Sequence, residues 1–63
     1  MGITFTAAEK HRAVLREIEM RKSVYPRRVM AGQMSQSQAN RQVAIMEAIA
    51  ADYAKLMEGE RLL

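Results

Sequence analysis

With 63 residues, 49% of them hydrophobic, and a net charge of +3, the chain is too short for more than one small domain and too apolar for a disordered tail. It contains no cysteine and a single histidine, which excludes disulfides and thiolate metal sites, and we expect neither a metal nor a cofactor. The core of so small a chain rarely contributes more than about 3–5 kcal/mol, so self-association is the stabiliser that remains.

No run approaches the roughly 18 apolar residues of a membrane span, and the start lacks the basic and apolar regions of a secretory signal. We therefore expect a cytoplasmic protein with no membrane partner. His11 is predicted on the apolar face of a helix, and Ser35 and Ser37 are explained by helix capping. We expect no enzymatic activity and no catalytic residue.

The first predicted helix spans residues 6–25 and follows an extended arm over residues 1–5. Thr6 and Glu9 have the spacing of a capping box, in which each side chain bonds the backbone amide of the other residue. Glu17 precedes Arg21 by four residues, which favours a helical ion pair. Residues at three- and four-residue steps define one face of this helix: Ala7, His11, Val14, Leu15, Ile18 and Tyr25.

A corner is predicted after this helix. Pro26 should end or sharply kink the helix, because it has no amide hydrogen and its ring clashes with the carbonyl of Lys22. Proline suits the first position of a new helix, and glycine suits the position just past a helix end. Residues 26–32 are therefore predicted to form a short helical turn bounded by Pro26 and Gly32, and Ser35 and Gln38 then form a second capping box.

The second predicted helix spans residues 36–58, and Gly59 is expected to stop it. Its first apolar ridge contains Ala39, Val43, Met46, Ala50, Tyr53 and Met57, and a second ridge beside it contains Ile45, Ile49 and Leu56. The two ridges cover about half of the helix circumference, more than the roughly 100° stripe that one partner helix needs. We therefore predict an all-α antiparallel helical hairpin that packs into a dimer or higher oligomer. The predicted core and oligomer residues are Val43, Ile45, Met46, Ile49, Tyr53, Leu56 and Met57.

Positive charge is concentrated around the predicted corner. Residues 20–46 contain five basic residues and no acidic one, namely Arg21, Lys22, Arg27, Arg28 and Arg41. Such a surface attracts phosphates or an acidic protein surface. Alternatively, it is a solvated surface that keeps a small oligomer soluble, or an acid from another chain pairs with it. The sequence has no RNA-binding signature, zinc-finger spacing or third helix of a helix-turn-helix, which places nucleic acid second among the expected partners.

The stretch REIEMRKSVYPRRVMAGQMSQSQANRQVAIMEAIAADY, residues 16–53, resembles small helical accessory proteins encoded by tailed phages and prophages. The likeness lies in a helix rich in glutamate and arginine, a tyrosine-proline corner, a glycine and a hydroxyl-capped second helix with a methionine-glutamate-alanine-isoleucine run. The resemblance implies a phage gene that is expressed inside a bacterium. It also implies a protein that acts by binding, including as an inhibitor of a host defence system. It assigns no functional residue. Nucleic-acid binding through the basic corner and a structural role in the phage particle or its assembly are the alternatives.

Overall fold

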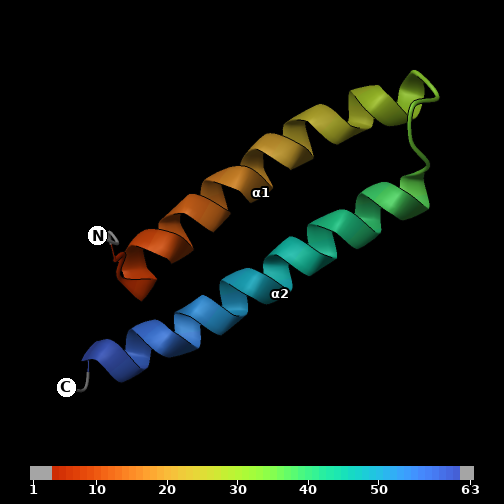
Figure 1. Cartoon of the computed structure of the whole chain (residues 1–63). Helices are drawn as coiled ribbons and strands as arrows, with labels where there is room; N and C mark the ends of the chain where they lie inside the picture. The colour runs from red at the N-terminus through yellow and green to blue at the C-terminus, as the bar shows by residue number, and fades with distance from the viewer. Residues whose placement is uncertain (1–3, 62–63) are drawn as a thin grey trace.

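The computed structural model describes residues 4–61, which form two α-helices and no strand. Helix α1 (Ala7–Met30) and helix α2 (Gln36–Arg61) lie side by side and run in opposite directions (Figure 1). The predicted all-α helical hairpin is confirmed. The molecule measures 47 × 25 × 16 Å, with the connecting loop, residues 31–35, at one end of the long axis.

Both predicted capping boxes are present. Thr6 Oγ1 accepts from the Glu9 amide at 3.1 Å, and Glu9 Oε1 accepts from the Thr6 amide at 3.3 Å. At the second helix, Ser35 Oγ accepts from the Gln38 amide at 3.0 Å, and Gln38 Oε1 accepts from the Ser35 amide at 2.9 Å. These bonds satisfy amide hydrogens that have no partner inside the first helical turn, so they fix where each helix begins.

Helix α1 does not end at the proline. The prediction of a helix end at residue 25 and a separate turn over residues 26–32 is wrong, because α1 continues through Pro26 to Met30. Proline removes one backbone hydrogen bond, but the helix packs against α2 at this point. Tyr25 is half-buried and lines a hollow together with Ala39 and Val43 of α2. This packing outweighs the local cost of the proline.

Gly32 ends the helix, as predicted. Its φ of +74° lies in the left-handed region that glycine adopts without strain. The Gly32 amide donates to the Val29 carbonyl at 3.1 Å, and the Gln33 amide donates to the Arg28 carbonyl at 2.8 Å. These two bonds form a Schellman motif, which satisfies the carbonyls of the last turn of α1.

Helix α2 extends further than predicted. It passes through Gly59 and includes Arg61, so the expected stop after residue 58 is wrong. A glycine inside a helix costs only about 1 kcal/mol relative to alanine. In return, the last turn places the Glu60 carboxylate at the start of α1, where Glu60 Oε1 accepts from the Ala7 amide at 3.1 Å. An acid at a helix N-terminus is stabilised by the free amides and the helix dipole.

Few side chains of the described chain are buried. These are Ala7 and Ile18 on α1 and Ala39 and Ala50 on α2. The rest of the predicted α1 face is half-buried, except for Leu15, which is 43% exposed. The three small alanines let the helices approach closely, but they bury little apolar surface. The hairpin therefore has a thin core.

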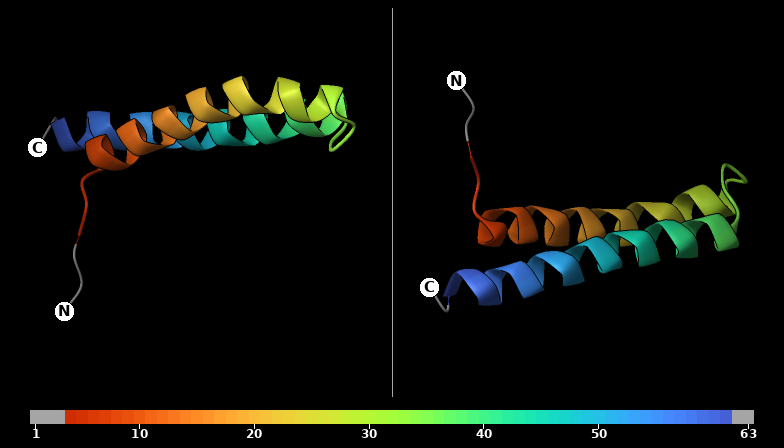
Figure 2. Two further views of the ribbon diagram at one scale, coloured as in Figure 1. Left: turned by 90° about the horizontal axis from the view of Figure 1, so that it is seen from above. Right: turned by 60° about the horizontal axis from the view of Figure 1, so that its bottom comes forward.

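The predicted extended arm lies only partly within the described residues. Residues 1–3 lie outside them, and residues 4–6 have no regular secondary structure and lead away from the helices (Figure 2). Phe5 is 56% exposed. Within residues 4–61, neither helix carries an apolar stretch long enough to cross a membrane.

Candidate functional site

The five basic residues predicted at the corner divide into two groups. Arg21 and Lys22 interact with other side chains of the hairpin, whereas Arg27, Arg28 and Arg41 are exposed. We call the half of the hairpin formed by residues 20–47 the loop end. It carries these five basic residues and one acid, Glu47, whereas the rest of the chain carries five basic and six acidic residues.

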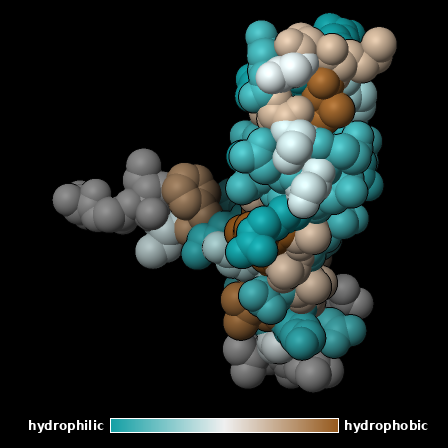
Figure 3. Space-filling view, turned by 90° about the vertical axis from the view of Figure 1, so that its right-hand side faces the viewer, coloured by the Kyte–Doolittle hydropathy of each residue, from teal (hydrophilic) through white to brown (hydrophobic). Residues whose placement is uncertain are grey.

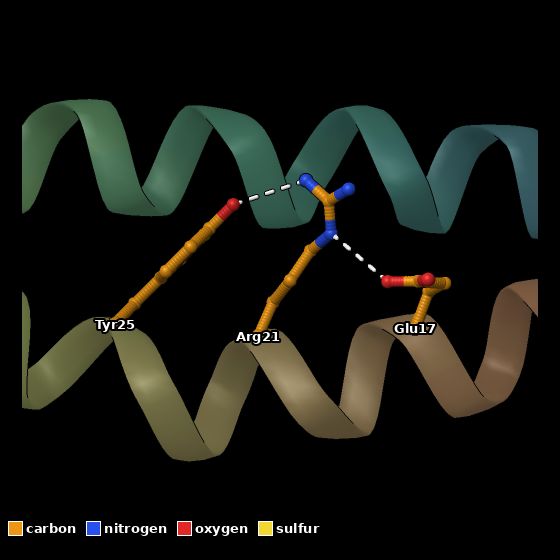
Figure 4. A network of polar contacts seen from close by, with 3 residues as sticks. All are labelled: Glu17, Arg21 and Tyr25. Carbon is orange, nitrogen blue, oxygen red and sulfur yellow. Dashed lines mark hydrogen bonds and ion pairs between the residues drawn. The ribbon is translucent and has the colours of Figure 1, made fainter.

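Arg21 is held along α1 by residues one turn away on either side (Figure 4). Its Nη1 donates to the Tyr25 hydroxyl oxygen at 3.0 Å, and its Nε lies 3.7 Å from Glu17 Oε2, which confirms the predicted ion pair. The Arg21 side chain is 30% exposed, and its Nε is buried without a hydrogen-bond partner among the described residues. Arg21 therefore belongs to the hairpin itself more than to a surface for a partner.

The sequence contained a signal for the Arg21–Tyr25 bond, because four residues separate the two side chains and this spacing makes them neighbours on a helix. The bond was not predicted, because the helix was expected to break at Pro26 and the residue before a proline is disfavoured in the helical conformation. Since α1 continues through Pro26, Tyr25 stays on the same side of the helix as Arg21.

Lys22 forms an ion pair across the two helices. Its Nζ lies 3.8 Å from Glu47 Oε2, and the two side chains are 51% and 55% exposed. An exposed pair of this kind contributes less than about 1 kcal/mol. Glu47 was missed as a partner because it lies one residue beyond the acid-free block, and only the antiparallel register brings it opposite Lys22.

The three exposed arginines leave the loop end in different directions. Each helical residue advances by about 100°, so Arg27 lies about 200° around α1 from Tyr25, which packs towards α2. By the same geometry Arg41 lies about 200° around α2 from the buried Ala39. The two arginines are thus on opposite outer sides of the hairpin.

Arg28 lies between these two directions, on one broad face of the hairpin, where it lines a hollow with Gln38 and Gln42 of α2. The structure therefore distributes the three arginines around the loop end and does not gather them in one flat patch. Figure 3 looks at this end and shows hydrophilic residues over much of it, with apolar residues between them.

The two predicted apolar ridges of α2 have different surroundings. Half-buried Val43, Met46, Tyr53 and Met57 lie on the same side of α2 as Ala39 and Ala50, which are buried in the hairpin. The second ridge is left uncovered: Ile45 is 42% exposed, Ile49 36% and Leu56 56%. We call these three residues the apolar stripe.

The apolar stripe marks one of the two broad faces of the hairpin, which we call the stripe face. Lys10 of α1 lies on the same face, because its Nζ is 5.8 Å from the centre of the Tyr53 ring, and Tyr53 is one turn from both Ile49 and Leu56. Arg28 also lies there, because Gln38 and Gln42 continue the line of the stripe towards the loop.

The opposite broad face, which we call the Glu47 face, carries the Lys22–Glu47 ion pair. A hollow beside this pair is lined by Leu15 of α1 and by Ala51 and Ala54 of α2. The exposed aliphatic residues of α2 are thus concentrated on the stripe face, whereas the same helix presents alanines to the Glu47 face.

Of the two serines assigned to capping, Ser35 caps α2, whereas Ser37 is exposed within the first turn of this helix and makes no capping bond among the described residues. The Thr6 and Ser35 hydroxyls cap the two helices, and His11 is half-buried on the predicted α1 face. Within residues 4–61 no three histidine, aspartate or glutamate side chains gather closely enough to hold a metal ion. Comparisons with protein families, with curated proteins and with solved structures found no match for this chain.

Proposed function

We propose that this chain is a non-enzymatic phage accessory protein that acts inside a bacterial host cell. It self-associates through the apolar stripe and binds an acidic surface of a host or phage protein with the exposed arginines of its loop end. The phage context rests on the resemblance of residues 16–53, which also suggests inhibition of a host defence system as the form that this binding takes.

The observation that carries the proposal is the distribution of exposed side chains. Large aliphatic residues are exposed on one side of α2, and guanidinium groups are exposed around the loop end. Large aliphatic residues exposed on one side of a helix in a small protein favour contact with another protein. Exposed arginines are suited to carboxylates, because the planar guanidinium can donate two parallel hydrogen bonds to one group.

A protein partner is favoured over nucleic acid by the directions of the arginines. Arg27 and Arg41 lie on opposite outer sides of the hairpin, so they do not line one groove that follows a phosphate backbone. The nearest aromatic side chain, Tyr25, is half-buried and accepts a hydrogen bond from Arg21, so it offers no free ring for base stacking.

The test is the double substitution Arg27→Glu and Arg41→Glu, assayed by pull-down of the tagged chain from phage-infected cells. We expect the captured partner to be lost, while the melting temperature and the oligomer mass remain those of the original chain, because both side chains are exposed. The matched control is Lys55→Glu together with Arg12→Glu, which changes the same charge outside the loop end.

The other outcomes of this experiment identify the alternatives. Equal capture by both double variants would contradict the role of the loop-end arginines. Salt-dependent binding of the chain to unrelated DNA, abolished by Arg27→Glu and Arg41→Glu, would favour nucleic acid, because each phosphate contact releases counterions. Recovery of the chain in purified virions would favour a structural or assembly role.

A further inference from the structure

The surface area of the hairpin suggests how much of it a second copy would cover. The chain exposes 5206 Å², whereas a compact monomer of its 7.2 kDa mass exposes about 4,100 Å². Its radius of gyration is 14.7 Å, against roughly 10.6 Å for a compact domain of this length. Residues 4–6 and the open faces of the hairpin both contribute to this excess. An excess of about 1,100 Å² is comparable to the roughly 800 Å² that each partner buries in a stable interface.

The stripe face is the face that a second copy would cover, because it holds the exposed Ile45, Ile49 and Leu56. Most homodimers are related by a two-fold axis, which places the same patch of both copies in contact. Two hairpins stacked through one broad face have two such arrangements. In one the loop ends lie together, and in the other they lie at opposite ends of the dimer.

The arrangement with the loop ends together stacks α2 of each copy on α1 of the other. The apolar stripe would then face the charged side chains that α1 contributes to the stripe face, which include Lys10, Arg21 and Arg28. Desolvating these charges against aliphatic residues is costly. The same arrangement also brings together two loop ends that each carry five basic residues and one acid.

The arrangement with the loop ends apart stacks α2 on α2 of the other copy in antiparallel orientation. The two-fold axis then lies midway between Ile45 and Leu56, near Ala50, so that Ile45 of each copy faces Leu56 of the other. This midpoint is also close to the middle of the hairpin, so the two copies overlap along almost their whole length. Each basic loop end lies beside the half of the other copy in which acids outnumber bases.

We infer that the partner of the apolar stripe is a second copy of this chain, packed through the stripe face with its loop end at the opposite end of a four-helix dimer. This inference rests on the self-association proposed above and adds the face and the orientation. The exposed arginines Arg27 and Arg41, on the outer sides of each hairpin, stay free for another partner at the two ends of the dimer.

Single spin labels on the full chain test the orientation, because the sequence has no cysteine of its own. Gln33→Cys places a label in the loop, far from the proposed axis, and Asp52→Cys places a label close to it. Both side chains are exposed. From the rise of 1.5 Å per helical residue, labels at position 33 should be more than about 40 Å apart, whereas labels at position 52 should be within about 20 Å.

Each outcome decides a different part of the inference. Short distances for both labels would mean that the loop ends lie together, which overturns the orientation while self-association stands. Long distances for both labels would overturn the stripe face as the interface. A monomeric mass by light scattering, with no distance between labels, would overturn the self-association on which the inference rests. Dilution with unlabelled chain should remove the signal, which verifies that the distances are between copies.

Discussion

At the scale of single residues, the hairpin changes the role of a charged side chain. Arg21 looks like any other member of the basic block in the sequence, but its guanidinium donates to Tyr25 and lies beside Glu17. Its side chain is only 30% exposed, and the aliphatic stems of long basic side chains often pack on apolar surface. Arg27, six residues later, is exposed and lies on the outer side of the same helix. The two arginines should therefore respond differently to truncation.

We predict that Arg21→Ala lowers the free energy of unfolding by about 1–2 kcal/mol, because it removes a hydrogen bond and the packing of the stem. Arg27→Ala is the matched control and should change this free energy by less than about 0.5 kcal/mol. Urea denaturation followed by circular dichroism measures both values. Equal effects of the two substitutions would contradict the structural role assigned to Arg21.

At the scale of the helices, the beginnings were predictable from sequence and the ends only in part. Thr6 and Ser35 act within four residues of chain, so their caps depend on nothing distant. Whether α1 continues through Pro26 depends on the packing of Tyr25 beside α2. The length of α2 depends on the hydrogen bond that the Glu60 carboxylate accepts from the Ala7 amide. Local patterns carry no information about such contacts between segments far apart in sequence.

The same limit applies to the candidate site. Composition identifies the basic residues around the loop, but their directions depend on whether α1 continues past Pro26. The pairing of Lys22 with Glu47 depends on the register between the helices. The second ridge of α2, in contrast, was predictable, because a single neighbouring helix cannot cover half of a helix circumference.

A continuous α1 predicts a gain in stability from Pro26→Ala. Proline inside a helix costs about 3 kcal/mol relative to alanine. Proline also restricts the unfolded chain, which stabilises the folded state by only about 0.4–1 kcal/mol. We therefore expect the free energy of unfolding to rise by about 2 kcal/mol. Gly59→Ala, inside α2 with nothing within 4 Å of the added carbon, should give a smaller gain of about 1 kcal/mol. Thermal denaturation measures both, and a loss of stability in Pro26→Ala would indicate that the chain breaks at residue 26.

At the scale of the whole molecule, shape and stability are linked. The hairpin is elongated, and the four buried residues among those that the structure describes include three alanines, so little apolar surface is removed from water. Proteins of this size that lack disulfides and metals gain their stability from association or from exceptionally well-packed helices. The exposed Ile45, Ile49 and Leu56 are the side chains with the most to gain from a second copy. Folding and assembly should then be a single step.

Coupled folding and assembly make the melting temperature depend on concentration, because the dimer is favoured by mass action. We expect the melting temperature to fall by roughly 5 °C for each tenfold dilution.

Ile49→Asp should remove the dimer and most of the helical circular dichroism together at micromolar concentration, because it buries a charge in the interface. Ala51→Asp, on the Glu47 face of the same helix, is the matched control and should keep both. Size-exclusion chromatography with light scattering and circular dichroism measure the two properties. A folded species of 7.2 kDa whose melting temperature is independent of concentration would mean that the hairpin is stable as a monomer.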